Sequence, residues 1–167
     1  VAAGNNGKNE GFTPTTSMIP VSATNSTDSK TSWSSFGNYV ALSAPGINIW
    51  TTYRNASYGT AWGTSLASPV VAGTVALMMS ANTKLKSTEI EGLLFSTAKD
   101  LGPVGRDPYF GYGRINAAAA VLAAKNATVS LAAAINTETP TVSIIEPLSG
   151  ATVNGIVPVD IQVSDNV

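Results

Sequence analysis

The apolar positions of this 167-residue chain change their spacing along its length. Short apolar runs lie at 18–25, 38–46 and 47–53, the first two ending at Asn and at Pro-Gly, and each predicts a short strand. Between 65 and 80, apolar residues fall on every face of one helix, which predicts that this helix is buried all round. The first half is therefore expected to be short strands and loops that lead into a buried helix.

Two further helices are predicted after it. Thr88 is followed three residues later by Glu91, a capping-box pattern, and apolar residues then recur at helical spacing. A Gly-rich turn at 111–114 precedes an Ala-rich helix that is expected to end near Lys125.

The composition changes after residue 125. Residues 126–140 carry one charge, Glu138, and end in Pro140, so we expect a linker. From residue 141 onward, apolar and polar residues alternate with the period of a half-buried strand. Residues 141–167 are expected to be a short β-hairpin and the truncated start of another β-module.

The composition excludes several classes of binding partner and of reactive site. Charged residues make up 11% of the chain and the net charge is −1, which leaves no electrostatic footprint for nucleic acid or an anionic membrane. The absence of cysteine excludes disulfides, thiolate metal sites and cysteine nucleophiles. Histidine is also absent, so a transition metal would need scattered carboxylates, and no metal site is expected. The apolar run 70–79 is too short for a bilayer, so no transmembrane segment is expected.

The stretch GTSLASP (63–69) places Ser65 where a nucleophile would be favoured. Free amides and the positive dipole end of a helix's first turn favour a developing oxyanion. Gly63 would let a substrate backbone approach closely, and Thr64 is a suitable N-cap residue. A serine hydroxyl still needs a base, and the chain has no histidine. Ordinary helix capping is the alternative interpretation of the same residues.

A second stretch, AAGNNG (2–7), supplies the group that such a nucleophile would need. Acyl transfer needs a donor aimed at the oxyanion, worth roughly 2.7–4 kcal/mol when one asparagine side chain supplies it. Asn5 lies on a tight loop just after a short strand. Taken alone, Asn5 is better explained as a turn residue.

Four stretches, in order, resemble the subtilisin-like serine proteases: AAGNNG, SSFGNYVALSAPG, GTSLASPVVAG and YGRINAAAAV. The resemblance covers residues 1–125. It implies an α/β fold, here part of a three-layer subtilisin-like domain with a mainly parallel sheet. The segment 141–167 resembles the start of a bacterial immunoglobulin-like module.

The resemblance assigns roles to particular residues. Ser65 corresponds to the nucleophile, and the side chain of Asn5 with the backbone amide of Ser65 corresponds to the oxyanion hole. Ala2, Ala3 and Gly4 correspond to one wall of the primary specificity pocket, and Thr64 lies beside the oxyanion. The loop after Asn5 is short and lacks the Tyr-Pro pair common in the family, so the resemblance does not define the floor of this pocket.

The resemblance also accounts for the missing base. In that family the triad aspartate and histidine precede the asparagine motif, so they would lie before Val1. We therefore expect the C-terminal part of a secreted or cell-surface endopeptidase, inactive by itself, whose partners are its upstream half and protein or peptide substrates. No cofactor is required. Relatives often bind calcium, and Asp28 with nearby Asn and Ser oxygens is either such a site or a solvated loop residue.

Two other functions remain open. A sedolisin-type peptidase has a similar serine motif and uses glutamate and aspartate in place of histidine, but it has an aspartate where this chain has Asn5. A non-catalytic surface-binding protein on a protease-like scaffold would also suit the β-rich tail, although such a scaffold would be free to lose Ser65.

Overall fold

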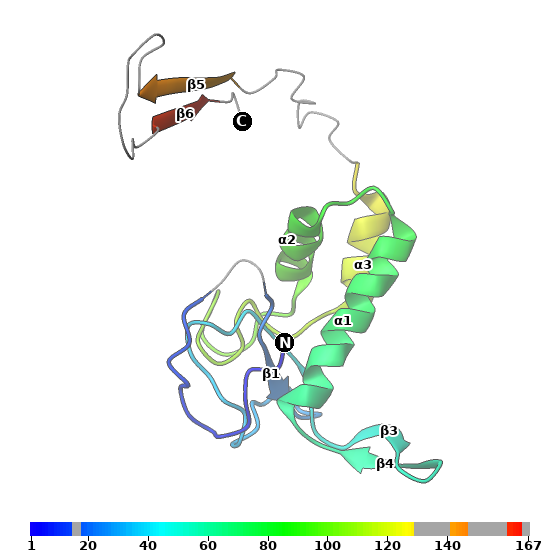
Figure 1. The fold of residues 1–167 in the computed structure, drawn as a ribbon. Coiled ribbons are helices and arrows are strands. Elements are labelled where there is room, and N and C mark those ends of the chain that lie inside the picture. The colour runs from blue at the N-terminus through cyan, green and yellow to red at the C-terminus, as the bar shows by residue number, and fades with distance from the viewer. Residues whose placement is uncertain (15–17, 129–140, 147–159, 165–167) are drawn as a thin grey trace. The chain divides into compact units, whose positions relative to one another are not determined.

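The computed structural model describes residues 1–14, 18–128, 141–146 and 160–164. Its contacts divide the chain into two units, Val1–Thr128 and Val129–Val167, which are described separately here (Figure 1).

Two buried parallel strands form the centre of the first unit. β1 (Val21–Thr24) pairs in parallel with β2 (Leu42–Pro45), with Val21 opposite Leu42. Ala2 extends this pairing by a parallel bridge to Val21. All four residues of β1 are buried, as expected for parallel strands covered on both faces. The strands predicted at 18–25 and 38–46 are confirmed over these shorter ranges.

Three helices accompany the strands. α1 (Thr64–Ala81) packs on β1, β2 and α3 (Ala117–Asn126), and α2 (Ser87–Thr97) packs mainly on α3 (Figure 1). Together these elements enclose one main apolar core: Val21, Ala23, Leu42, Ala44, Ala67, Val71, Met78, Ile90, Leu94, Ile115, Ala120 and Ala124. The predicted α/β class is thus seen in the described residues, as three helices with small sheets.

The prediction that α1 is buried all round is wrong. Its buried residues are Thr64, Ala67, Val71, Thr74 and Met78. Leu77 and Met79 are 58% and 52% exposed, because the described elements cover a single face of the helix. By length and composition alone α1 could cross a bilayer. The apolar run 70–79, which was judged too short from the sequence, is only part of this helix. Its buried face belongs to the main apolar core.

The predicted capping box at Thr88 is also wrong. α2 begins at Ser87, one residue earlier, with Lys86 as its N-cap. The carboxylate of Glu89, not that of Glu91, accepts a hydrogen bond from the Lys86 backbone N–H at 2.7 Å. Because α2 begins at Ser87, Thr88 lies inside its first turn and cannot be the N-cap.

A two-stranded hairpin leads into α1. The predicted strand at 47–53 is found as β3 (Ile49–Tyr53), and it pairs antiparallel with β4 (Ser57–Ala61), which the sequence did not predict. β4 has no apolar run to mark it. The hairpin extends away from the core near the start of α1 (Figure 1), and Trp50 is 69% exposed on it.

In the second unit, β5 (Thr141–Glu146) pairs antiparallel with β6 (Asp160–Ser164), with Thr141 opposite Ser164 and a register shift between Ile144 and Glu146. The predicted turn between these strands and most of the predicted linker (126–140) lie outside the described residues. The immunoglobulin-like module therefore stays a prediction.

Candidate active site

The start of α1 is a tight corner between the core and the hairpin. Gly63, rather than Thr64 as predicted, is the N-cap residue, with φ 141°. Its N–H donates to the Gly46 carbonyl at 2.8 Å, while its own carbonyl accepts from the N–H groups of Leu66 and Ala67. Ser65 is exposed at this corner, and its N–H has no acceptor among the described residues. The hydroxyl and the N–H of Ser65 are both open to a ligand.

Thr64 holds the side chain of Asn5 against this corner. The backbone N–H and the hydroxyl of Thr64 both donate to Asn5 Oδ1, each at 2.9 Å. Because a backbone N–H can only donate, the oxygen of the Asn5 amide must face Thr64. The Asn5 Nδ2 group is therefore directed elsewhere, and it has no acceptor within the described residues. Thr64 is fully buried, and its Oγ1 also accepts from the Gly4 N–H at 3.2 Å.

The candidate nucleophile Ser65 and the two candidate donors lie around one point above Gly63. A Cβ atom built on Gly63 would lie 2.9 Å from Ser65 Oγ, 3.4 Å from Asn5 Nδ2 and 3.7 Å from the Ser65 backbone nitrogen. Residues about sixty positions apart thus direct a hydroxyl and two N–H donors to one small space. Glycine keeps that space empty and also allows the positive φ. The arrangement can bind an acyl group whose carbonyl oxygen gains negative charge.

The predicted wall, Ala2 to Gly4, runs beside β1. Ala3 is buried, its N–H donates to the Val21 carbonyl at 3.0 Å, and its carbonyl accepts from the Tyr39 hydroxyl at 2.8 Å. Burial, with a smaller contribution from Glu10, raises the pKa of Tyr39, so this hydroxyl remains protonated and can donate.

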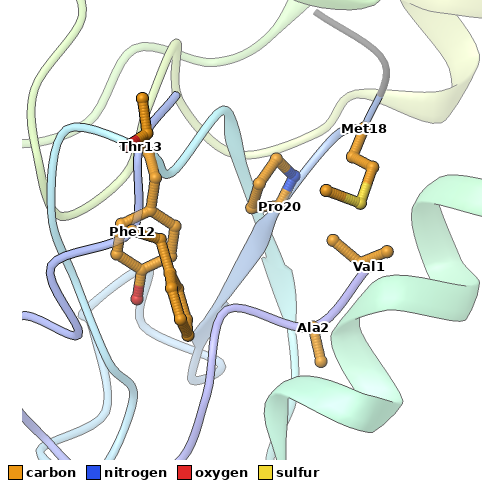
Figure 2. Close-up of a pocket in the computed structure, with 7 residues that line it drawn as sticks. Val1, Ala2, Phe12, Thr13, Met18 and Pro20 are labelled. Carbon is orange, nitrogen blue, oxygen red and sulfur yellow. The ribbon is translucent and has the colours of Figure 1, made fainter. Parts of the chain in front are cut away.

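Ala2 lines a hollow of about 210 Å³ whose lining is mostly apolar (Figure 2). The lining residues are Val1, Ala2, Phe12, Thr13, Met18, Pro20 and Tyr39. The sequence did not identify Phe12, Met18 or Tyr39 as neighbours of the wall, because their approach depends on how the following loop folds back.

Residues 33–36, also missed from the sequence, lie along the loop that carries Asn5. The Gly4 carbonyl accepts from the Ser35 N–H at 2.9 Å, and the Gly7 N–H donates to the Trp33 carbonyl at 2.8 Å. This segment precedes β2, and residues 34–36 begin the stretch SSFGNYVALSAPG. The presence of that stretch together with AAGNNG in one chain was the sequence feature that could have linked the two segments.

The sequence of this chain matches a known protein family. A family model described as "Subtilase family" matches residues 1–113, well over half of the chain, and includes Asn5, Gly63 and Ser65. The chain belongs to the subtilase family.

Curated relatives of this subtilase chain include several extracellular proteases. It is 44% identical over 137 residues to an extracellular protease of Xanthomonas campestris, covering 75% of the chain and 23% of the relative. It is 39% identical over 104 residues to subtilisin DY of Bacillus licheniformis, covering 62% and 37%. For the minor extracellular protease Epr of Bacillus subtilis, the values are 40% over 99 residues, 59% and 15%. The chain thus spans well under half the length of each.

Asp28 in this subtilase chain is not the solvated loop residue that the sequence allowed. Its carboxylate contacts Lys99 Nζ at 2.8 Å and Arg114 Nε at 2.6 Å. The hydrogen bond from Lys99, assisted by the charge of Arg114, holds the pKa of Asp28 below its ordinary value. A calcium ion at Asp28 would have to displace both cations, and the calcium site stays a prediction.

Proposed function

We propose that this chain supplies the nucleophile and the oxyanion hole of a serine endopeptidase. Ser65 attacks the scissile carbonyl, and Asn5 Nδ2 with the Ser65 N–H binds the oxygen as it becomes negative. The observation that carries the proposal is the convergence of these three groups above Gly63, at 2.9, 3.4 and 3.7 Å from one point.

The base is proposed to come from a segment that precedes Val1. The chain has no histidine, yet a serine hydroxyl at neutral pH must be activated by a positioned base. In the proposed enzyme, a histidine takes the Ser65 proton and then gives it to the leaving amine, and an aspartate orients that histidine. The same segment would continue the parallel sheet of β1 and β2 and cover the exposed face of α1.

The substrate is proposed to be a protein or peptide, with one side chain held against Ala2, Ala3 and Gly4. The apolar hollow beside Ala2 supports this assignment. The names of two relatives, which describe them as extracellular, support a secreted location. A cell-surface location is proposed as the alternative, and residues 141–167 are proposed to begin an immunoglobulin-like module that positions the enzyme.

A serine-directed fluorophosphonate probe tests the proposal. In the enzyme completed by the preceding segment, peptide mapping should find the probe on Ser65, and Ser65→Ala should abolish both labelling and peptide hydrolysis. Ser68→Ala is the matched control, because Ser68 lies one turn further along α1. Loss of hydrolysis in Ser68→Ala but not in Ser65→Ala would overturn the proposal. A non-catalytic scaffold would show neither labelling nor hydrolysis.

The isolated 167-residue chain gives a second test. Without a base it should hydrolyse peptides at no more than a background rate. Measurable turnover by the isolated chain that disappears in Ser65→Ala would show that the base lies within these residues, contrary to the proposal.

A further inference from the structure

We infer that Ser35 and Glu10 position the oxyanion donor Asn5. The inference rests on the proposed function, and it assigns a role to two residues that lie outside the nucleophile corner. Neither residue touches the space above Gly63. Ser35 contacts the backbone on both sides of Asn5, and Glu10 accepts hydrogen bonds from Ser35 and from the Asn6 side chain.

The first part of the argument is how Ser35 contacts the Asn5 loop. Its backbone N–H donates to the Gly4 carbonyl at 2.9 Å, directly before Asn5. Its hydroxyl oxygen accepts from the Asn6 N–H at 3.1 Å, directly after Asn5. One residue thus holds the peptide groups that precede and follow Asn5. With Thr64 holding Asn5 Oδ1, these contacts fix both the backbone and the side chain of Asn5.

The second part is a closed ring of hydrogen bonds. The Ser35 hydroxyl, which accepts from Asn6, donates to Glu10 Oε1 at 2.7 Å. The Asn6 side-chain Nδ2 donates to the same Glu10 oxygen at 2.9 Å. The hydroxyl of Ser35 therefore has one orientation, in which its oxygen accepts from the loop.

The burial of Ser35 and the negative charge of Glu10 strengthen the hydrogen bonds of this ring. Ser35 is fully buried, and the side chain of Glu10 is 13% exposed. The hydrogen bonds from Ser35 and then Asn6 lower the pKa of Glu10, so the carboxylate is ionised near neutral pH. Hydrogen bonds to an ionised acceptor are stronger than neutral ones. Lys8 lies 4.0 Å away with 67% of its side chain exposed, and it adds little.

A donor in an oxyanion hole must be placed precisely. Removing one such donor costs about 10²–10³ in kcat, and a misplacement of about 1 Å can cost about 10². Ser35→Ala removes the acceptor of the Asn6 N–H but keeps the backbone contact to Gly4. We therefore expect kcat to fall on the order of tenfold with KM nearly unchanged, which is less than the loss from deleting the donor.

The test compares this variant with Ser34→Ala in the completed enzyme. Ser34 is equally buried and adjacent, but its hydroxyl oxygen accepts from the Ala23 N–H at 3.0 Å and so supports β1. Both variants should lower the melting temperature, and only Ser35→Ala should lower kcat. Glu10→Gln, which keeps an acceptor oxygen, should retain more kcat than Glu10→Ala.

A double-mutant cycle separates positioning from general stability. Because Ser35 acts through Asn5, Ser35→Ala should lower kcat no further in an Asn5→Ala background. Equal losses in both backgrounds, or no loss of kcat in Ser35→Ala, would overturn the inference. Failure of the proposed function would look different, because hydrolysis would then either be absent from the completed enzyme or persist in Ser65→Ala.

Discussion

Two segments flank the Gly63–Ser65 corner, and they are held in opposite ways. The loop 4–9 is held by hydrogen bonds to distant residues, among them Ser35 and Thr64. The hairpin β3–β4 is held mainly by pairing between its own strands. At its tip Asn55 and Ala56 both have positive φ, 61° and 51°, a conformation that costs an alanine free energy.

The difference indicates where precision is needed. The loop 4–9 carries a donor that must lie within a fraction of an ångström of its target, and long-range contacts supply that accuracy. The hairpin carries no group that the proposed chemistry uses, and its exposed aromatic side chains and strained turn are compatible with variation. Changes at the corner should therefore affect catalysis, and changes in the hairpin should affect stability alone.

The largest expected effect comes from adding a methyl group at Gly63, and the same change at Gly59 is the control. In Gly63→Ala the new Cβ lies 2.9 Å from Ser65 Oγ, at a positive φ. We expect kcat/KM of the completed enzyme to fall about 10²-fold or more, because nucleophile and donor are displaced. In Gly59→Ala the new Cβ meets a Tyr53 ring carbon at 3.6 Å, an ordinary contact. Equal kinetic losses in the two variants would refute the contrast.

The second effect concerns two threonines: Thr64, which contacts the loop 4–9 from the start of α1, and Thr60 in the hairpin. Thr64→Val removes a hydroxyl that donates to Asn5 and accepts from the Gly4 N–H. Leaving a buried N–H without a partner should cost about 1–3 kcal/mol in the free energy of unfolding, and kcat should fall as well. Thr60→Val, on the exposed face of β4, should change neither quantity measurably. Urea unfolding and steady-state kinetics measure both.

A smaller effect of opposite sign is expected at the hairpin tip. Ala56→Gly relieves a positive φ of 51° and should raise the free energy of unfolding by up to about 1 kcal/mol, with kcat/KM unchanged. Loss of stability in this variant, or a change in kinetics, would show that the hairpin tip is coupled to the site.

The smallest effect is the response to acid. Hydrogen bonds from Ser35 and Asn6 lower the pKa of Glu10 in the folded state. Glu10 therefore contributes stability above its unfolded pKa, and this contribution is lost as pH falls through the lower, folded pKa. The destabilisation by Glu10→Gln should shrink as the pH falls from neutral to below the ordinary pKa of a glutamate and through the lower folded pKa, while the effect of Ala56→Gly stays constant. Residues 49–61 contain no carboxylate, so a parallel pH trend in both variants would contradict this assignment.

The sequence predicted the parts of the site that depend on neighbouring residues. The start of α1 within the stretch 63–69 follows from the local pattern of these residues. The pairing of Asn5 with that corner came from the resemblance, because no local rule joins residues about sixty positions apart. The two hydrogen bonds of Ser35 to Gly4 and Asn6 could not be predicted, because they depend on how residues 33–36 lie along the loop 4–9.

Other errors have simple causes. The apolar pattern of α1 did not indicate which face the described elements cover, so the exposure of Leu77 was missed. The Thr88–Glu91 pattern did not mark the start of α2, because the Glu89 carboxylate accepts from the Lys86 N–H instead. β4 was missed because it lacks an apolar run, and its strand conformation is recognised only from its pairing with β3.

The central claim is that Asn5 Nδ2 binds the oxyanion, and Asn5→Ala tests it most directly. In the completed enzyme kcat should fall about 10²–10³-fold with little change in KM, because the donor acts in the transition state. Asn116→Ala is the matched control: Asn116 Oδ1 accepts from the Ala119 N–H at 3.1 Å and caps α3, so this variant should lose about 1 kcal/mol of stability and keep its kcat. An Asn5→Ala enzyme that keeps its kcat would contradict the account.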